Sequence, residues 1–437
     1  MQSKCLTHAS HEQKCEFTSP PDFLDVKGKR VIANNISLMV KQPEFTKTGI
    51  EQWFTRRSVD HATSFSGSSP TVISFGDIKN VTGCAGLKHL PVVIKCYSEN
   101  VESSDRPRLE GLRYESRVYA CVVANMTTVP FFAFPYAIFS KRPALTDKLE
   151  MKVAKYLRRI SRPESGKGIT HNGVKNRGVL SPVNYIVMED CGNLTLEHTV
   201  KHCTGSTFIQ LTLQMLSALK VMQENEITNN DMHWKNVLVQ KGAPSFFMDM
   251  KSGQVLSGNT SIHPANLGYT NYDCARVDAG NLVKIFDWDA AVVHRLSENT
   301  YTHEHGLHTN VFKKMFDTIG FLKKWKHAIW KYPGRNTAEH SHLNQKFRKL
   351  FHVCFGRLEQ EYPWALRDGK GGPYFQATCY PVDDESLKNP NTTMEYQDDC
   401  WKTWPQDLDE DFEPAVTAFT SLLGELLPAT NRFRSVK

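Results

Sequence analysis

The feature that most constrains this chain is a long amphipathic segment followed at once by a short polar one. In residues 207–226 the apolar side chains recur three or four positions apart, which places them on one face of a helix: Phe208, Leu211, Met215, Leu219 and Met222. Thr204 or Ser206 is suited to cap its start. The polar segment TNNDMHWKN follows at 228–236 and precedes the apolar run VLV. Residues 228–236 are therefore predicted to form a loop that presents an acid and an amide, Asp231 and Asn236.

The segments before this helix alternate between strand and helix patterns. TVISFGDI at 71–78 and HLPVVIKCYS at 89–98 are rich in β-branched residues and suit paired strands. Residues 109–123 have apolar side chains at helical spacing, and 129–139 and 182–190 are predicted as two further strands. We therefore expect an α+β chain in which an antiparallel sheet with one main helix precedes a mostly helical part.

Composition limits the class of protein. Hydrophobic residues make up 40% of the 437 residues and charged residues 23%, which fits a globular chain with a substantial core. The longest apolar run, 129–139, is too short to span a bilayer, and no charged-then-apolar signal segment opens the chain. The eleven cysteines show no CxxC pair, so we expect free thiols. Together these observations predict an intracellular protein, in cytoplasm or nucleus, without a membrane partner.

Charge and periodicity suggest where the organised part begins and ends. Residues 1–69 lack strong periodicity and are predicted to form a partly ordered N-terminal extension. Residues 152–177 carry eight Lys and Arg side chains and suggest an exposed insertion, which would favour an acidic or chromatin-associated partner. Residues 356–437 are predicted to form an acidic C-terminal extension that ends in a helix from Ala415.

Five motifs contain residues of the types used in catalysis or ligand binding, and they follow one another along the chain. VVIK ends in Lys95 on a predicted strand, and YESRVY places Glu115 on the helix that follows. YIVMEDCGN forms the last strand and a link to the long helix, and DMHWKN then supplies Asp231 and Asn236. LVKIFDWD places Asp287 after an apolar strand. Each motif alone is weak, but their joint order is specific.

In this order the motifs resemble those of protein kinases. DMHWKNVLV resembles the haspin-like branch of atypical kinases, and LRYESRVY is similar to a helix of serine/threonine kinases encoded by large DNA viruses. The resemblance covers roughly residues 70–330. It implies a bilobal protein-kinase-like fold, with an N-lobe and hinge at 70–192 and a C-lobe at 193–355 that contains an insertion at about 241–282.

The resemblance also implies an activity, the transfer of the γ-phosphate of ATP to Ser or Thr hydroxyls of protein substrates. Lys95 would hold the α and β phosphates, and Glu115 would orient it through an ion pair. Asn236 and Asp287 would hold Mg²⁺ through the oxygen ligands that this ion prefers. Asp231 would orient the acceptor hydroxyl and take its proton.

The resemblance to protein kinases implies roles for further positions. His233 stands two residues after the acid, where ordinary protein kinases have Lys. Glu189 and Cys191 would face the adenine, behind Met188 as the gatekeeper. Gly76 is the candidate for close approach of the backbone to phosphate, although SFGDIKNVTGCAG lacks GxGxxG spacing and an ordinary turn fits it equally well. In NVFKKMFDTIGFLKKW, Asp317 is a structural candidate that would brace the catalytic loop.

Two alternatives concern the site itself. Asp249 lies 18 residues after Asp231, near the usual spacing for the metal-binding aspartate, whereas Asp287 lies 56 residues after it. We prefer Asp287 because an apolar strand precedes it.

Asn229 and Asn230 stand where most kinases have His and Arg. Loss of that Arg removes a partner for activation-loop phosphate, so we predict an enzyme that such phosphorylation does not gate.

Two alternatives concern the function. A pseudokinase that binds nucleotide as a scaffold would explain the weak glycine loop and the paired asparagines. A small-molecule phosphotransferase of aminoglycoside or choline type would share the D-x-H-x-x-N loop and the acidic DWD motif. The retained Lys, Glu, Asp and Asn oppose the first alternative, and the haspin-like MHWKNVLV opposes the second.

Overall fold

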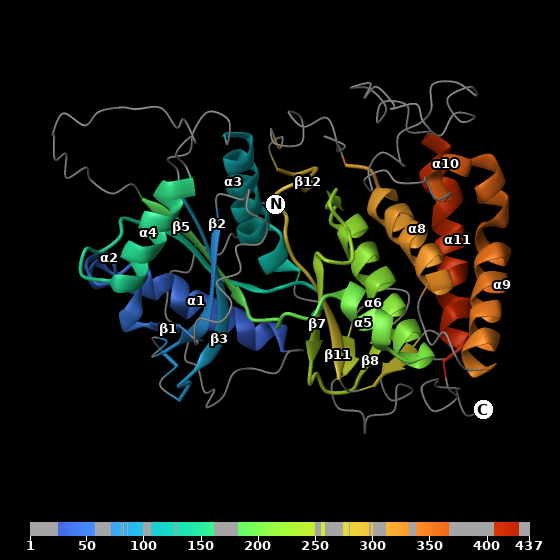
Figure 1. Cartoon of the computed structure of the whole chain (residues 1–437), viewed down its shortest axis with the longest axis horizontal. Coiled ribbons are helices and arrows are strands. Elements are labelled where there is room, and N and C mark those ends of the chain that lie inside the picture. The colour runs from blue at the N-terminus through green and yellow to red at the C-terminus, as the bar shows by residue number, and fades with distance from the viewer. Residues whose placement is uncertain are drawn as a thin grey trace. The chain divides into compact units, whose positions relative to one another are not determined.

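The chain divides into two compact units in a computed structural model (Figure 1). Unit 1 comprises Met1–Thr127 and Ala133–Asp190, and unit 2 comprises Thr128–Phe132 and Cys191–Lys437. The structure describes residues 25–56, 71–98, 106–160, 182–249, 255–257, 274–296, 299, 312–331, 338–366 and 406–427, apart from a few single positions within these ranges. The main division follows Asp190, inside the segment expected to be the hinge.

Unit 1 is built on a five-stranded antiparallel sheet. Its strands are β1 (Phe54–Arg56), β2 (Thr71–Ile78), β3 (Leu90–Ser98), β4 (Pro135–Lys141) and β5 (Val183–Glu189), in the spatial order β1-β2-β3-β5-β4. One long helix, α3 (Arg106–Cys121), connects β3 to a 3₁₀ turn at Val123–Asn125 and then to β4. The prediction of an α+β chain with an antiparallel sheet is confirmed. The predicted strand at 129–139 starts later than expected, because β4 begins only at Pro135.

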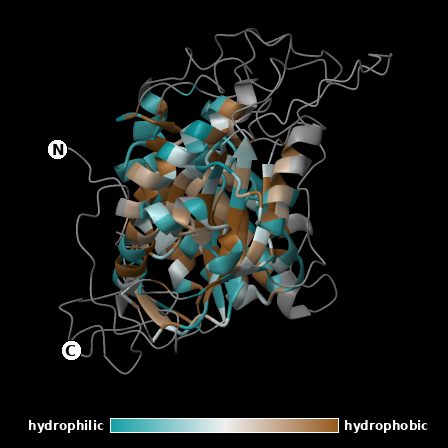
Figure 2. Cartoon of the chain, turned by 90° about the vertical axis from the view of Figure 1, so that its left-hand side faces the viewer, coloured by the Kyte–Doolittle hydropathy of each residue, from teal (hydrophilic) through white to brown (hydrophobic). Residues whose placement is uncertain are grey.

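The two faces of this sheet have different environments because side chains alternate along a strand. On β3, Val92, Ile94 and Cys96 are buried in a hydrophobic cluster that includes residues of the helices α1 (Val26–Met39) and α4 (Lys148–Ile160). Lys95 lies between two of these residues in sequence and so projects from the opposite face. Figure 2 shows the hydrophobic residues concentrated on the strands, with hydrophilic residues on the outer sides of the helices.

The N-terminal region is part of unit 1, which corrects the boundary expected at residue 69. Helix α1 (Val26–Met39) begins at Asp25, whose carboxylate accepts the Gly28 N–H at 2.8 Å. Its apolar side chains at Ile32, Ala33 and Ile36 are fully buried, and it packs on β4. A short helix, α2 (Pro43–Lys47), and a 3₁₀ turn (Ile50–Gln52) then lead into β1, which pairs with β2. The spacing of Ile32, Ile36 and Met39 is a local helical pattern, although residues 1–69 were predicted to lack strong periodicity.

The first part of the expected basic insertion is also structural. Helix α4 (Lys148–Ile160) buries Leu149, Val153 and Leu157, which recur every four residues along one face. Its Glu150 forms a buried ion pair with Lys141 of β4 at 2.7 Å. The exposed insertion therefore cannot begin at 152, and its remaining basic residues, from Arg162 onward, lie outside the described residues.

Cysteine usage differs from expectation at two positions. Cys96, Cys191, Cys203 and Cys354 are free thiols, but Cys84 and Cys121 are disulfide-bonded. The prediction that the cysteines are free thiols is therefore wrong for these two. Among the described helices, none is both long enough and apolar enough to cross a membrane.

Unit 2 is mainly helical and is centred on α6 (Gly205–Glu224). Thr204 caps this helix by accepting the Thr207 N–H at 3.2 Å, as one of the two predicted caps would. The preceding helix is α5 (Leu196–His202), and the following helices are α8 (Phe316–Lys331), α9 (Ala338–Glu361) and the short α10 (Pro363–Leu366). Trp325 of α8 is completely buried and donates to the Thr212 hydroxyl of α6 at 2.8 Å.

The C-terminal helix α11 (Gln406–Glu425) belongs to this helical core. Its Phe419 ring lies 5.1 Å from Trp325 and 5.3 Å from Phe355 of α9. The boundary expected at 355 is therefore wrong, because α9 runs through it to Glu361. The acidic stretch DLDEDFE forms the first turns of α11, where Leu408 and Phe412 are fully buried, so the helix starts well before Ala415.

Two pairs of short strands frame the loops of interest in unit 2. Strand β7 (Val237–Lys241) pairs with β11 (Asn281–Ile285), and β6 (Ile227–Thr228) pairs with β12 (Val292–Val293), both antiparallel. The chain segment that connects β7 to β11 forms a separate three-stranded sheet of β8 (Phe246–Asp249), β9 (Val255–Ser257) and β10 (Cys274–Val277). This sheet occupies the position of the insertion expected at about 241–282.

Candidate active site

The predicted site residues fall into two groups, one in each unit. In unit 1, the Lys95 ammonium on β3 donates to the Glu115 carboxylate on α3 at 2.7 Å. The Glu115 side chain is 1% exposed and that of Lys95 12% exposed, so the pair lies beneath the surface with the ammonium nearer to solvent. The Tyr97 hydroxyl, two residues along the same face of β3, lies 2.9 Å from the Ser116 hydroxyl of α3. The expected ion pair is therefore present, and a second polar contact holds the helix to the strand beside it.

Gly76 does not lie in a loop. It sits within β2, opposite Arg56 of β1, and a Cβ at this position would collide with the Phe54 ring and the Thr55 carbonyl oxygen. Glycine is therefore required here by the close packing of β1 against β2. The prediction that Gly76 approaches a phosphate is replaced by this packing role. The connection between β1 and β2, residues 57–70, lies outside the described residues.

Glu189 and Cys191 lie at the end of β5 and just beyond it. The Glu189 side chain is buried and accepts the Lys29 ammonium of α1 at 2.7 Å and the Phe134 N–H at 3.3 Å. Its carboxylate therefore has a structural function, and only its backbone remains a candidate for contact with adenine. Cys191 is a buried free thiol that begins the second segment of unit 2.

In unit 2, a buried carboxylate fixes the loop that carries Asp231. Asp317, in the first turn of α8, accepts the backbone N–H of Asn229 at 2.5 Å and that of Asn230 at 3.2 Å. Burial raises the pKa of Asp317 to about 7, against the opposing effect of these two hydrogen bonds. The predicted bracing role of Asp317 is therefore present as a pair of direct contacts.

The two asparagines connect this loop to the segment after β11. The Asn229 amide donates to the Asp287 carbonyl oxygen at 2.9 Å, and its own oxygen accepts the Asp231 N–H at 3.1 Å. The Asn230 amide donates to the Ala290 carbonyl oxygen at 2.9 Å. Asn230 has φ 63°, a left-handed conformation that Asn adopts more readily than Arg or most other residues. The sequence TNND thus matches both the backbone geometry and the hydrogen bonding of this site.

Asp231 and Asn236 are held together at the two ends of the loop. The Asn236 amide nitrogen donates to the Asp231 carboxylate at 2.7 Å and to its backbone carbonyl oxygen at 3.1 Å. Because the nitrogen makes both contacts, the amide oxygen points the other way and is the atom suited to bind a metal ion. Burial and then the nearby charge of Asp287 raise the pKa of Asp231 to about 7, partly offset by the Asn236 hydrogen bond.

His233 organises the interior of the loop. Its Nδ1 accepts the N–H groups of Lys235 at 3.2 Å and Asn236 at 3.1 Å. A neutral imidazole whose Nδ1 accepts carries its proton on Nε2, and burial lowers the pKa of His233 and so favours this neutral form. The Nε2 atom lies 3.6 Å from the Asp231 carboxylate, too far for a strong hydrogen bond. His233 therefore positions the backbone between the acid and the amide.

Asp287, rather than Asp249, lies beside the loop that carries Asp231. Asp287 follows β11 with φ 67°, a strained conformation of the kind that clusters at functional sites. Next to it, Trp288 is completely buried and packs on Phe132 with ring centroids 5.9 Å apart. Asp249 instead lies at the end of β8, opposite Cys274 of β10 in the three-stranded sheet. Of the two acids, it is Asp287 that contacts Asn229 and raises the pKa of Asp231.

No protein-family model matches this chain, and no curated protein matches it significantly. The chemistry inferred for this site therefore rests on the motifs and on the contacts described above. Among the described residues, no group of three His, Cys, Asp or Glu side chains is arranged to hold a metal ion. Asn236 and Asp287 are the two residues whose side-chain oxygens would be suited to hold a magnesium ion.

Sequence reasoning missed several residues that shape the site. Asn229 and Asn230 were considered only as departures from a motif, although their hydrogen bonds join the loop that carries Asp231 to the segment that carries Asp287. Lys29 lies in a region that we did not assign to the domain, yet its ammonium neutralises Glu189. The burial of Trp288 has only a weak local signal, because Phe286 and the acid Asp287 separate it from the apolar strand that ends at Ile285.

Proposed function

We propose that this chain is an ATP- and Mg²⁺-dependent protein kinase that phosphorylates Ser or Thr hydroxyls, built on a bilobal protein-kinase-like fold. The observation that carries the proposal is the set of contacts joining Asp317, Asn229, Asp287, Asp231 and Asn236 in unit 2. An acid suited to be a base, with an amide and a second acid suited to bind a cation, is the group that phosphoryl transfer needs.

Unit 1 supports the same proposal independently. A Lys on the third strand of an antiparallel sheet, paired with a Glu on the following helix, is the arrangement with which protein kinases hold the non-transferred phosphates. The buried Glu115 carboxylate keeps the Lys95 ammonium in one orientation, which lowers the entropic cost of placing a phosphate beside it.

Each site residue of unit 2 then has a defined role in the proposed reaction. Asp231 accepts the proton of the incoming hydroxyl, and Asn236 and His233 fix the orientation of its carboxylate and of the loop. Asn236 and Asp287 would hold Mg²⁺, which when bound neutralises charge on the phosphates. The contacts from Asp317 and the asparagines hold the loop in place before substrate arrives, so less reorganisation is needed during the reaction.

In the proposed enzyme, phosphorylation of an activation loop is not needed to assemble this arrangement. In the motif that this site resembles, an Arg precedes the catalytic Asp and reads activation-loop phosphate. Here Asn230 occupies that position and bonds the Ala290 carbonyl oxygen. This contact supports the prediction of an enzyme that is not gated by such a phosphate.

The experiment that tests the proposal is a substrate screen with γ-labelled ATP and Mg²⁺. We expect the full-length chain to label Ser or Thr residues of proteins in a cell lysate and to leave a panel of aminoglycosides, choline and other small alcohols unlabelled. Labelling of a small alcohol alone would support the small-molecule phosphotransferase instead. Nucleotide-dependent stabilisation without any transfer would support the pseudokinase, because binding stabilises a protein whether or not turnover follows.

A further inference from the structure

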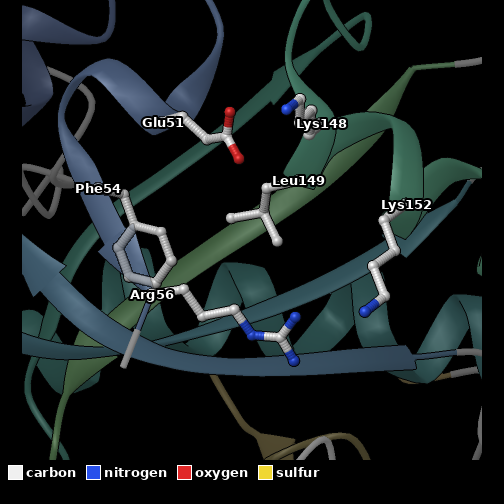
Figure 3. Close-up of a pocket in the computed structure, with 6 residues that line it drawn as sticks. All are labelled: Glu51, Phe54, Arg56, Lys148, Leu149 and Lys152. Carbon is white, nitrogen blue, oxygen red and sulfur yellow. The ribbon is translucent and has the colours of Figure 1, made fainter. Parts of the chain in front are cut away.

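Unit 1 contains a small, positively charged pocket between the end of β1 and the first turns of α4 (Figure 3). Its volume is about 160 Å³, and it is lined by Glu51, Phe54, Arg56, Lys148, Leu149 and Lys152. Pockets that hold drug-sized ligands usually measure roughly 300 Å³ or more. This pocket is therefore too small for a nucleotide and has the size expected for a single ionic group.

Two elements of unit 1 supply the cations of this pocket. Arg56 reaches in from β1 and Lys152 from α4, and Figure 3 shows their charged ends directed toward the same space. Among the described residues, neither these two nor Lys148 forms an ion pair. The neighbouring acids are already engaged. Asp147 accepts the N–H groups of Glu51 and Glu150 at 2.8 Å each, and Glu150 pairs with Lys141.

We propose that this pocket binds the phosphate group of a phosphorylated side chain in a partner protein. Three positive side chains and the carboxylate of Glu51 leave two net positive charges, which match a phosphate monoester that carries about −1.5 to −2 at pH 7. A carboxylate would neutralise only half of this charge. The floor is apolar, because Phe54 and Leu149 are both buried, and charge interactions beside an apolar wall are less screened than in open water.

A neighbouring feature favours a polypeptide as the source of the phosphate. Leu145, three residues before Lys148 in the connection from β4 to α4, is 78% exposed. Among the described residues, Leu145 and Val353 are the large hydrophobic side chains with this degree of exposure. An apolar contact beside a phosphate pocket suits a peptide that carries an apolar residue near its phosphorylated one. A free small phosphate ester would gain nothing from Leu145.

The pocket is separate from the Lys95–Glu115 pair. Phe54 and Leu149 belong to the hydrophobic cluster that covers the Val92, Ile94 and Cys96 face of the sheet, whereas Lys95 projects from the other face. Binding here does not require phosphoryl transfer, so the inference goes beyond the proposed kinase activity and is tested without nucleotide. A failure of one proposal therefore leaves the other standing.

The test uses the full-length protein and a degenerate phosphoserine and phosphothreonine peptide library, with the same library unphosphorylated. Binding is measured by fluorescence polarisation for the wild type and for Lys148→Gln/Lys152→Gln. The matched control, Lys27→Gln/Lys88→Gln, removes the same charge from exposed lysines of unit 1 that do not line the pocket. Arg56→Gln provides a second pocket variant, and thermal melts establish that each protein is folded. Inorganic phosphate and O-phosphoserine are tested as competitors.

We expect the phosphorylated library to bind at least about tenfold more tightly than the unphosphorylated one, in line with charge-assisted hydrogen bonds. This preference should disappear in the pocket variants and persist in the control. Equal binding of both libraries to the wild type would overturn the proposal. Equal loss in pocket and control variants would also overturn it, because it would indicate attraction to net charge alone. Tight binding of inorganic phosphate or O-phosphoserine without binding of any phosphopeptide would exclude a protein ligand.

Discussion

The side-chain amide of Asn229 donates a hydrogen bond to the backbone carbonyl oxygen of Asp287 at 2.9 Å, so the loop that carries Asp231 is joined directly to the proposed metal-binding residue. The same side chain accepts the Asp231 N–H at 3.1 Å. One short residue thus links the backbones of Asp231 and Asp287, the two acids to which we assign roles in the proposed phosphoryl transfer. Asp317 holds the Asn229 backbone from the other side, through a contact with the first turn of α8.

Replacement of Asn229 should therefore lower the rate of the proposed reaction. In Asn229→Ala both side-chain contacts are lost, and we expect kcat to fall about tenfold to a hundredfold, because small displacements of catalytic groups have effects of this size. Steady-state kinetics with a labelled protein substrate measures this change. Asn281→Ala, which removes an asparagine whose side chain accepts from Lys241 on the surface of unit 2, is the control. A kcat equal in both variants and the wild type would contradict the proposed link.

Activity should not depend on phosphorylation of the chain. Asn230 has φ 63° and its amide donates to the Ala290 carbonyl oxygen, so the loop that carries Asp231 is held by contacts within the chain. We expect phosphatase-treated protein, whose dephosphorylation is verified by mass spectrometry, to retain the kcat of untreated protein. Loss of activity that rephosphorylation restores would refute this prediction.

The pH dependence should report the ionisation of Asp231. Burial, with a further contribution from the charge of Asp287, raises the pKa of Asp231 to about 7. A general base must be deprotonated, so kcat/KM should rise with pH and level off above about pH 7. In Asp287→Asn the pKa of Asp231, followed by carbon NMR of its carboxyl group, should fall but stay above the ordinary value of 3.8, because burial is the larger cause. A flat pH profile across neutrality would exclude this role.

The N-terminal helix should be needed for the stability of unit 1. Lys29 and Glu189 form a buried ion pair at 2.7 Å, with side chains 2% and 5% exposed. Lys29→Met leaves the buried carboxylate without its ammonium partner, and such changes typically cost about 3–5 kcal/mol. Lys29→Met/Glu189→Gln should recover part of this loss. Chemical denaturation measures these differences, with the exposed neighbour Lys27→Met as control. Equal stability of Lys29→Met and Lys27→Met would show that the pair contributes little.

The sequence predicted the elements whose patterns are local. The apolar stripe of the helix at Gly205–Glu224 and its Thr204 cap come from residues that are close together in the sequence. The Lys95–Glu115 pair was expected from the resemblance of VVIK and YESRVY to protein-kinase motifs, and the contact is present. Asp317 was expected to brace the catalytic loop from its place in a helical motif, and its two contacts are present.

The features that sequence reasoning did not predict depend on contacts between distant segments. Nothing near Gly76 indicates that Phe54 packs against it, because the pairing of β1 with β2 joins segments on either side of residues 57–70. The charge of Lys29 is neutralised by Glu189, 160 residues away. The basic character of 152–160 concealed a buried stripe on α4, because composition averages over the two faces of a helix.

Transfer of the γ-phosphate by wild type and Asp231→Asn tests the central claim most directly. With labelled ATP, Mg²⁺ and a protein substrate, we predict that Asp231→Asn transfers phosphate about 10²- to 10⁴-fold more slowly, the usual contribution of a general base. Its nucleotide-dependent thermal stabilisation should equal that of the wild type, because Lys95 and Glu115 are unchanged. An Asp231→Asn protein that transfers phosphate at the wild-type rate would contradict the assignment of Asp231 as the catalytic base.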